Sequence, residues 1–137
     1  MDRAEALDRV ATARSGHLAT VGPSETPHVV VVTFAVVGEA VVTAVDHKPK
    51  TTTRLQRLVN IERNPKASLL VDHYENEWDA LWWVRIDGTA SSHAGGEVHS
   101  SAVEALAAKY EQYADRAPDG PVIALSIDRV SFWESTP

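Results

Sequence analysis

The chain has 137 residues, of which 44% are hydrophobic and 23% charged, and its formal net charge is −6. This length predicts one domain over residues 1–137, and the acidic balance argues against general binding to nucleic acids or anionic membranes. The absence of cysteine excludes disulfides, thiolate nucleophiles and cysteine-based metal sites. No apolar run approaches the roughly 20 residues of a membrane span, and the N-terminus lacks the apolar core of a signal peptide, so we expect a cytoplasmic protein.

Apolar runs separated by turn residues predict a helix and three strands in the first third of the chain. The helix is expected over residues 2–14, where Asp2 can act as the N-cap. The strands are expected at 17–21, 28–37 and 40–45. The run 28–37 is almost continuously β-branched or apolar, which is typical of a strand covered on both faces. The Gly38-Glu39 turn predicts that this run and the next form a hairpin.

The rest of the chain predicts two more helices and three more strands. One helix is expected to be capped by Thr51, Thr52 or Thr53 and to end at Asn64-Pro65, because proline disfavours helical geometry in the residue before it. The second helix is expected over 97–115, and the strands at 66–74, 82–91 and 122–133, the last in two halves. About six antiparallel strands without regular βαβ alternation predict a mainly β, α+β fold: a barrel with helices packed outside it.

Positive charge is concentrated between Asp46 and Lys66. This stretch holds six of the thirteen Lys and Arg residues: Lys48, Lys50, Arg54, Arg57, Arg63 and Lys66. A strand end here meets the free N–H groups of the following helix, so the stretch predicts an anion pocket for a phosphorylated cofactor. The bend at Pro49 lets both lysines reach one phosphate. A solvated loop for the lysines and a salt-bridged surface for the arginines are the alternatives.

Motifs for other kinds of chemistry are missing. The sequence has no nucleophile elbow, Walker loop or dinucleotide-binding glycine motif. Its six histidines show no metal-binding spacing, so no metal is expected. We expect His93 and His99 to be exposed loop residues, and the carboxylates near residues 72–79 to belong to a solvated loop. The catalytic residue is unknown, so difficult chemistry would come from a bound cofactor.

Several segments together carry a resemblance to a known family. They are the strand run from Pro27, the strand of Thr43 followed by Lys48-x-Lys50, the helix end at Asn64-Pro65 and the strand from Lys66. Their order and spacing, over about residues 5–133, resemble the pyridoxamine 5′-phosphate oxidase-like split β-barrel superfamily. Segments 45–50 and 81–85 are similar to a subgroup of actinobacterial oxidoreductases that use the deazaflavin coenzyme F420.

The resemblance implies a homodimer with cofactor sites at the subunit interface. On the matching positions, Lys48, Pro49 and Lys50 would hold the cofactor phosphate, with Thr43 adding a hydroxyl. Val31 and Thr33 would line the cofactor ring. The tryptophans expected where the partner subunit approaches ring and substrate are Trp78, Trp82 and Trp83.

The expected activity is hydride transfer between F420 and an unsaturated small organic substrate. The longer, carboxylate-bearing tail of F420 suits a wide cationic surface that includes Arg54, which favours it over FMN. The alternatives are an FMN-binding oxidoreductase of the same fold and a non-catalytic barrel that holds a cofactor or haem. Trp82 and Trp83 are neighbours on a predicted strand, so one ring should lie on each face; core and dimer-interface packing would also explain them.

Overall fold

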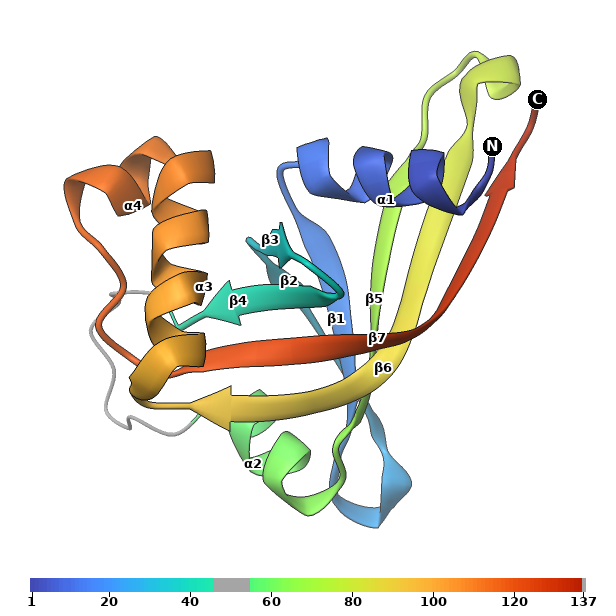
Figure 1. Cartoon of the computed structure of the whole chain (residues 1–137). Helices are drawn as coiled ribbons and strands as arrows, with labels where there is room; N and C mark the ends of the chain where they lie inside the picture. Colours follow the sequence, from blue (N-terminus) through green and yellow to red (C-terminus); the bar gives the residue numbers. More distant parts are fainter. Residues whose placement is uncertain (46–54, 137) are drawn as a thin grey trace.

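The computed structural model describes residues 1–45 and 55–136, and the remaining residues lie outside the described part (Figure 1). Its helices are α1 (Arg3–Thr12), α2 (Gln56–Arg63), α3 (Gly96–Lys109) and α4 (Glu111–Asp115), with the 3-10 turns η1 (Pro23–Glu25) and η2 (Trp78–Ala80). Its strands are β1 (Gly16–Val21), β2 (Pro27–Val32), β3 (Ala35–Val37), β4 (Ala40–Ala44), β5 (Lys66–His73), β6 (Trp82–His93) and β7 (Val122–Glu134). Within these residues, no helix is long and apolar enough to cross a membrane.

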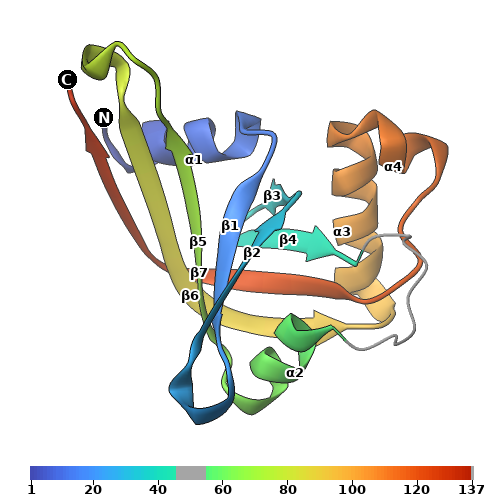
Figure 2. The same ribbon diagram turned by 180° about the vertical axis from the view of Figure 1, so that it is seen from behind.

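The strands form a single curled antiparallel sheet. Its order is β2-β1-β5-β6-β7-β4-β3, so β2 and β3 lie at opposite edges although they are consecutive in the chain. Only Thr33 and Phe34 separate these two strands, a stretch that spans at most about 11 Å between the flanking residues. The sheet must therefore curl until its edges approach each other, as Figures 1 and 2 show. The result is the expected α+β barrel, with seven strands instead of about six.

The predicted single strand 28–37 is wrong in two respects. It is two strands, β2 and β3, because the chain crosses between the sheet edges at Thr33-Phe34. The strand β2 is also not covered on both faces, since Val29 and Val31 are 60% and 68% exposed. A β-branched run predicts extended chain, but it does not reveal where a strand changes partners. The predicted hairpin at Gly38-Glu39 is confirmed, because Val37 pairs with Ala40.

The predicted helix 97–115 is also interrupted. Tyr110 has extended backbone angles of φ −116° and ψ 121°, which end α3 and begin the short α4. Its buried hydroxyl accepts a hydrogen bond from the Phe34 N–H at 3.1 Å. The helical pattern continues through Tyr110, so sequence periodicity alone does not locate this break.

A bulge divides the long pair β6–β7 into two halves. Asp87 pairs with Arg129 but Gly88 pairs with Ile127, which leaves Asp128 as the extra residue. A Cβ on Gly88 would lie 2.0 Å from the Ser126 carbonyl oxygen, so the close approach requires glycine. Bulges bend and twist strands, which accounts for the curl of the sheet here and for the predicted two halves of the last strand.

The helices close the barrel from outside. The N-cap prediction for α1 is confirmed, since Asp2 accepts a hydrogen bond from the Glu5 N–H at 2.9 Å. The helix α2 ends at Asn64 as predicted, but its N-cap is Leu55, so the predicted threonine cap is wrong. One apolar cluster fills the barrel interior, and a second lies between α3 and the β3–β4 hairpin (Figure 1).

Candidate functional site

The residues predicted to bind the cofactor phosphate fall on the part of the chain that the structure does not describe. Lys48, Pro49, Lys50 and Arg54 all lie outside the described residues, so their cofactor-binding roles stay predictions. The described flanks are the end of β4 and the start of α2. At the first flank, the Val45 N–H donates to the Pro121 carbonyl at 3.2 Å, which ties the end of β4 to the loop before β7.

Two predicted contact residues, Thr33 and Thr43, meet at the crossing between β2 and β3. The Thr43 hydroxyl donates to the Thr33 carbonyl at 2.6 Å, and the Thr33 hydroxyl lies 3.0 Å from the Tyr113 hydroxyl on α4. Thr43 is buried. Its proton is therefore committed to the backbone of the crossing, and it would have to leave the Thr33 carbonyl in order to donate to a phosphate.

The outer face of the sheet carries an apolar groove. Alternation along the strands directs Leu18 and Leu69 into the core, and their neighbours outward. The outward residues of β1, β2, β5 and β6 surround a groove of about 500 Å³, lined by His17, Ala19, Val29, Ser68, Leu70, Asp72, Trp83 and Arg85. Val31 pairs with His17 across β1 and β2, so it borders this groove. We call these eight lining residues and Val31 the outer face.

The two adjacent tryptophans lie on opposite faces of β6, as the alternation predicts. Trp83 lines the groove, whereas Trp82 packs against the barrel core below α1. The Arg9 guanidinium lies 5.4 Å from the Trp82 ring centroid, and the His73 ring stacks on Trp82 at 6.4 Å. Trp82 is therefore on the opposite face from Val31 and Trp83 in the same chain. Its predicted role at a partner's ring stays a prediction.

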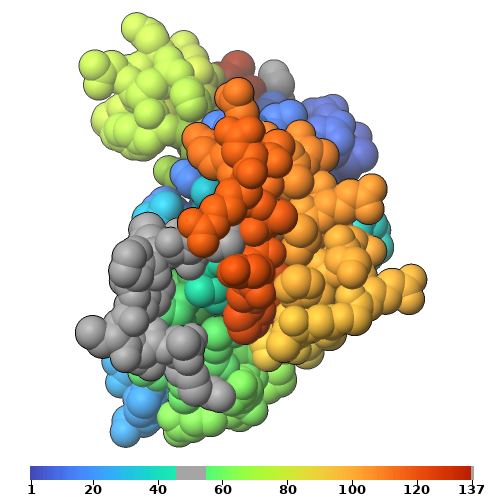
Figure 3. Space-filling view, turned by 90° about the vertical axis from the view of Figure 1, so that its left-hand side faces the viewer, coloured from blue at the N-terminus to red at the C-terminus, as the bar shows by residue number. Residues whose placement is uncertain are grey.

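The third of these tryptophans, Trp78, lies at the tip of the β5–β6 hairpin. Its side chain is 67% exposed, and this hairpin stands out from the body of the molecule (Figure 3, yellow-green). The carboxylates predicted for a solvated loop are on the same hairpin, where Glu75 contacts His73 through its Oε2 atom. The described residues include no group of three or more His, Asp or Glu side chains that could hold a metal.

Two of the polar side chains that line the groove, Ser68 and Arg85, are held by Asp87. Asp87 accepts from the Ser68 hydroxyl at 2.5 Å and from the Arg85 Nε at 3.3 Å. A second hollow of about 450 Å³ adjoins the groove, because Ala19 and Ser68 line both. An apolar floor with polar side chains at its edge suits a flat ring or a second protein surface.

The two histidines predicted to be exposed loop residues are not. His93 is half-buried at the end of β6, where its Nε2 lies 2.8 Å from the Ser91 hydroxyl. His99 is on α3, and its Nε2 lies 2.9 Å from the Gly120 carbonyl. The Gly-Gly turn between them is shorter than expected, since α3 already begins at Gly96.

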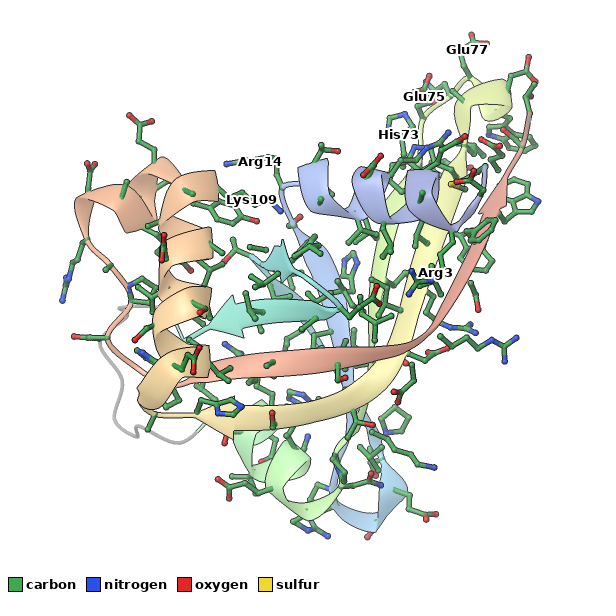
Figure 4. The ribbon with its side chains drawn as sticks, in the orientation of Figure 1. Arg3, Arg14, His73, Glu75, Glu77 and Lys109 are labelled. Atoms are coloured by element: carbon green, nitrogen blue, oxygen red, sulfur yellow. The ribbon has the colours of Figure 1, made fainter. Side chains whose placement is uncertain are left out.

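Sequence reasoning missed a basic cluster next to the strand crossing. Lys109 donates to the Phe34 carbonyl at 2.9 Å, and Arg14 donates to the Lys109 carbonyl at 3.3 Å (Figure 4). Burial, together with the neighbouring Arg14, lowers the pKa of Lys109 to about 8. Burial also raises the pKa of Tyr110. Lys109 and Tyr110 are 95 and 96 positions from Arg14 in the chain, so no local sequence pattern indicates the cluster.

Comparisons with known proteins agree with this fold. A conserved hypothetical protein from Mycobacterium tuberculosis is 23% identical, with a TM-score of 0.80 over 98% of this chain and 86% of that one. A heme binding protein from Mycobacterium smegmatis is 22% identical, with a TM-score of 0.73 over 93% of this chain and 51% of that one. A FAD-binding protein from Mesorhizobium loti is 17% identical, with a TM-score of 0.74 over 96% and 94% of the two chains.

At these identities the solved structures show the fold alone, and no curated protein matches the sequence. The family assignment rests instead on a sequence model of the pyridoxamine 5′-phosphate oxidase family, which matches residues 3–134. That match runs from the start of α1 to the end of β7 and so includes every described helix and strand. The chain therefore belongs to the pyridoxamine 5′-phosphate oxidase family.

Proposed function

We propose that this protein is an F420-dependent oxidoreductase that transfers a hydride between the deazaflavin and an unsaturated small organic substrate. The family assignment supports a bound redox coenzyme, and the cationic stretch supports a phosphorylated one with a long anionic tail. FMN is the nearest alternative within the same fold. F420 is preferred because its extra tail carboxylates match the positive charge concentrated between Asp46 and Lys66.

The observation that carries the proposal is the apolar groove on the outer face. Val29, Leu70 and Trp83 give it walls suited to an isoalloxazine-like ring, which presents large flat apolar faces. Val31 and Trp83, two of the predicted ring contacts, border this groove. The residues present therefore fit the ring of such a coenzyme.

The same face suits a second copy of the chain. Val29, Val31 and Leu70 are all exposed large apolar side chains on β2 and β5, the two strands that flank β1, an arrangement that marks an interaction surface. A twofold dimer would place this face against its own copy, since an isologous interface uses one patch twice. The coenzyme ring would then lie between two subunits, where the exposed Trp78 of one chain could approach the ring held by the other. Trp82 packs against the barrel core on the opposite face of β6, so this arrangement leaves it away from the ring.

In this proposal each part of the chain has a distinct task. Lys48 and Lys50 bind the phosphate, while Thr43 holds the Thr33 backbone in place. The outer face orients the ring and excludes water from it. A bound deazaflavin supplies the hydride chemistry. The protein contributes position and charge, in keeping with the lack of an identifiable catalytic residue.

The proposal is tested by titrating the purified protein with F420 and with FMN and following coenzyme fluorescence. We expect saturable quenching by F420 and weak retention of FMN; the reverse result transfers the assignment to FMN. Lys50→Ala should weaken F420 binding by about 1.5–3 kcal/mol, as expected for a lost hydrogen bond to a charged group. Arg116→Gln, which removes an exposed charge after α4, is the matched control. An unchanged dissociation constant in Lys50→Ala would remove Lys50 from the site.

A second candidate is a non-catalytic haem-binding barrel. His17 lines the apolar groove, and a histidine in an apolar pocket is the common axial ligand of haem iron. Haem titration followed by its Soret absorption separates the two functions. A sharp Soret shift that is lost in His17→Ala, without quenching of F420 or FMN fluorescence, would favour the haem carrier.

A further inference from the structure

Two cationic side chains lie side by side where α1, α3 and the strand crossing meet. Figure 4 shows Arg14, between α1 and β1, beside Lys109 at the C-terminal end of α3. An Arg14 Nη1 donates to the Lys109 carbonyl at 3.3 Å, and the Lys109 Nζ donates to the Phe34 carbonyl at 2.9 Å. Each side chain uses one donor in this way, which leaves further N–H groups on both.

Aromatic rings hold these two cations in place. The Arg14 guanidinium lies 4.6 Å from the Tyr110 ring centroid, and the Lys109 ammonium lies 5.2 Å from the same centroid. The Lys109 ammonium is also 4.0 Å from the Phe34 ring centroid. Tyr110 is itself fixed, because its hydroxyl donates to the Arg14 carbonyl at 2.9 Å. The two cations are therefore preorganised, and a ligand would meet little ordering cost there.

This pair has no carboxylate partner in the described part of the chain. Arg3, Arg9 and Arg85 each form an ion pair with a nearby acid, whereas neither Arg14 nor Lys109 does. The C-terminal end of α3 offers a partial charge of only about −0.5, against two full positive charges. Burial and the neighbouring Arg14 lower the pKa of Lys109, which is the signature of an uncompensated cation.

We propose that Arg14 and Lys109 form a binding site for a small oxyanion, a carboxylate or a phosphate group. An arginine fork beside a lysine ammonium is the donor set that such groups prefer. Binding would neutralise the two like charges and use their remaining N–H donors. The site shares no residue with the outer face, and its test does not require a bound coenzyme.

The proposal is tested by ¹H–¹⁵N NMR titration of the wild-type protein at pH 7, first with inorganic phosphate and then with succinate, against chloride at equal ionic strength. We expect saturable shifts of the Phe34, Lys109 and Tyr110 amide signals. The anion that gives them identifies the ligand chemistry as phosphate or carboxylate. If neither anion shifts these signals, the proposal is overturned.

Variants separate binding from a purely structural clamp. Arg14→Gln and Lys109→Met should each weaken the anion by about tenfold, as expected for a lost charged hydrogen bond. Arg116→Gln should leave the dissociation constant unchanged. If Arg14→Gln lowers the melting temperature while the anion affinity persists, the two side chains serve only to tie α3 to the strand crossing. The wild-type titration decides the matter even if a variant fails to fold.

Discussion

Val31→Asp should break the proposed dimer without unfolding the subunit. In the single chain the Val31 side chain is 68% exposed on the edge strand β2, so an aspartate there keeps most of its water. The cost to the subunit should therefore stay within about 1 kcal/mol, the spread of strand propensities. In a dimer closed through the outer face, the same carboxylate would be buried against the second copy.

The size of the effect on dimerisation follows from that burial. A buried, unpaired charge costs several kcal/mol after relaxation, and a twofold interface contains the substitution twice. The sum is about 4–6 kcal/mol, which raises the dimer dissociation constant by about three to four orders of magnitude. Sedimentation velocity over a range of protein concentrations measures this shift directly.

The matched control is Val98→Asp. Val98 is also an exposed apolar residue, at 42%, but it lies on α3 and not on the outer face. We expect a dimer in this control and a folded monomer in Val31→Asp, with the same far-ultraviolet circular dichroism. A Val31→Asp protein that sediments as the wild type does would refute the outer face as the interface.

Three further predictions concern stability and pH. Gly88→Ala should destabilise the fold by about 3 kcal/mol or more in urea denaturation, because the added Cβ would collide with the Ser126 carbonyl. The control is Gly95→Ala, which should be close to neutral because a Cβ at this position has no atom within 4 Å. Asn60→Ala should cost about 2–3 kcal/mol in the same assay, since buried Asn60 donates to the Thr20 hydroxyl at 3.0 Å and its loss leaves that group unsatisfied. The pKa of Lys109 is lowered from 10.5 to about 8, so between these pH values the folded state binds fewer protons than the unfolded state. The wild type should therefore gain stability relative to Lys109→Met as the pH rises from 8 towards 10. A difference in melting temperature between the two proteins that stays constant over this pH range would contradict the prediction.

Local signals in the sequence predicted much of the fold. The Gly38-Glu39 hairpin, the end of α2 at Asn64 and the opposite faces of Trp82 and Trp83 are all confirmed. Each depends on a turn residue, a proline or strand alternation, and these act over a few residues. The family resemblance added the split barrel, which periodicity alone leaves as one of several closed β folds.

What the sequence did not predict depends on contacts between distant segments. The strand 28–37 is divided because its halves pair with different strands, β1 and β4. The break at Tyr110 coincides with a hydroxyl that bonds the Phe34 backbone. The groove likewise collects His17, Leu70 and Trp83 from three strands, and only the register β1–β5–β6 places them together. The predicted roles of Lys48, Lys50 and Arg54 stay predictions.

The most direct test of the central claim, that one sheet face seats both the second subunit and the coenzyme ring, is a pair of F420 titrations by isothermal calorimetry. One uses the wild type and the other Val31→Asp, with FMN run in parallel. Because the ring would need both subunits, and because Val31 itself borders the groove, we expect the coenzyme that binds the wild-type dimer to lose affinity for the Val31→Asp monomer by about tenfold or more. A monomeric Val31→Asp protein that binds F420 or FMN as tightly as the wild type would contradict the account.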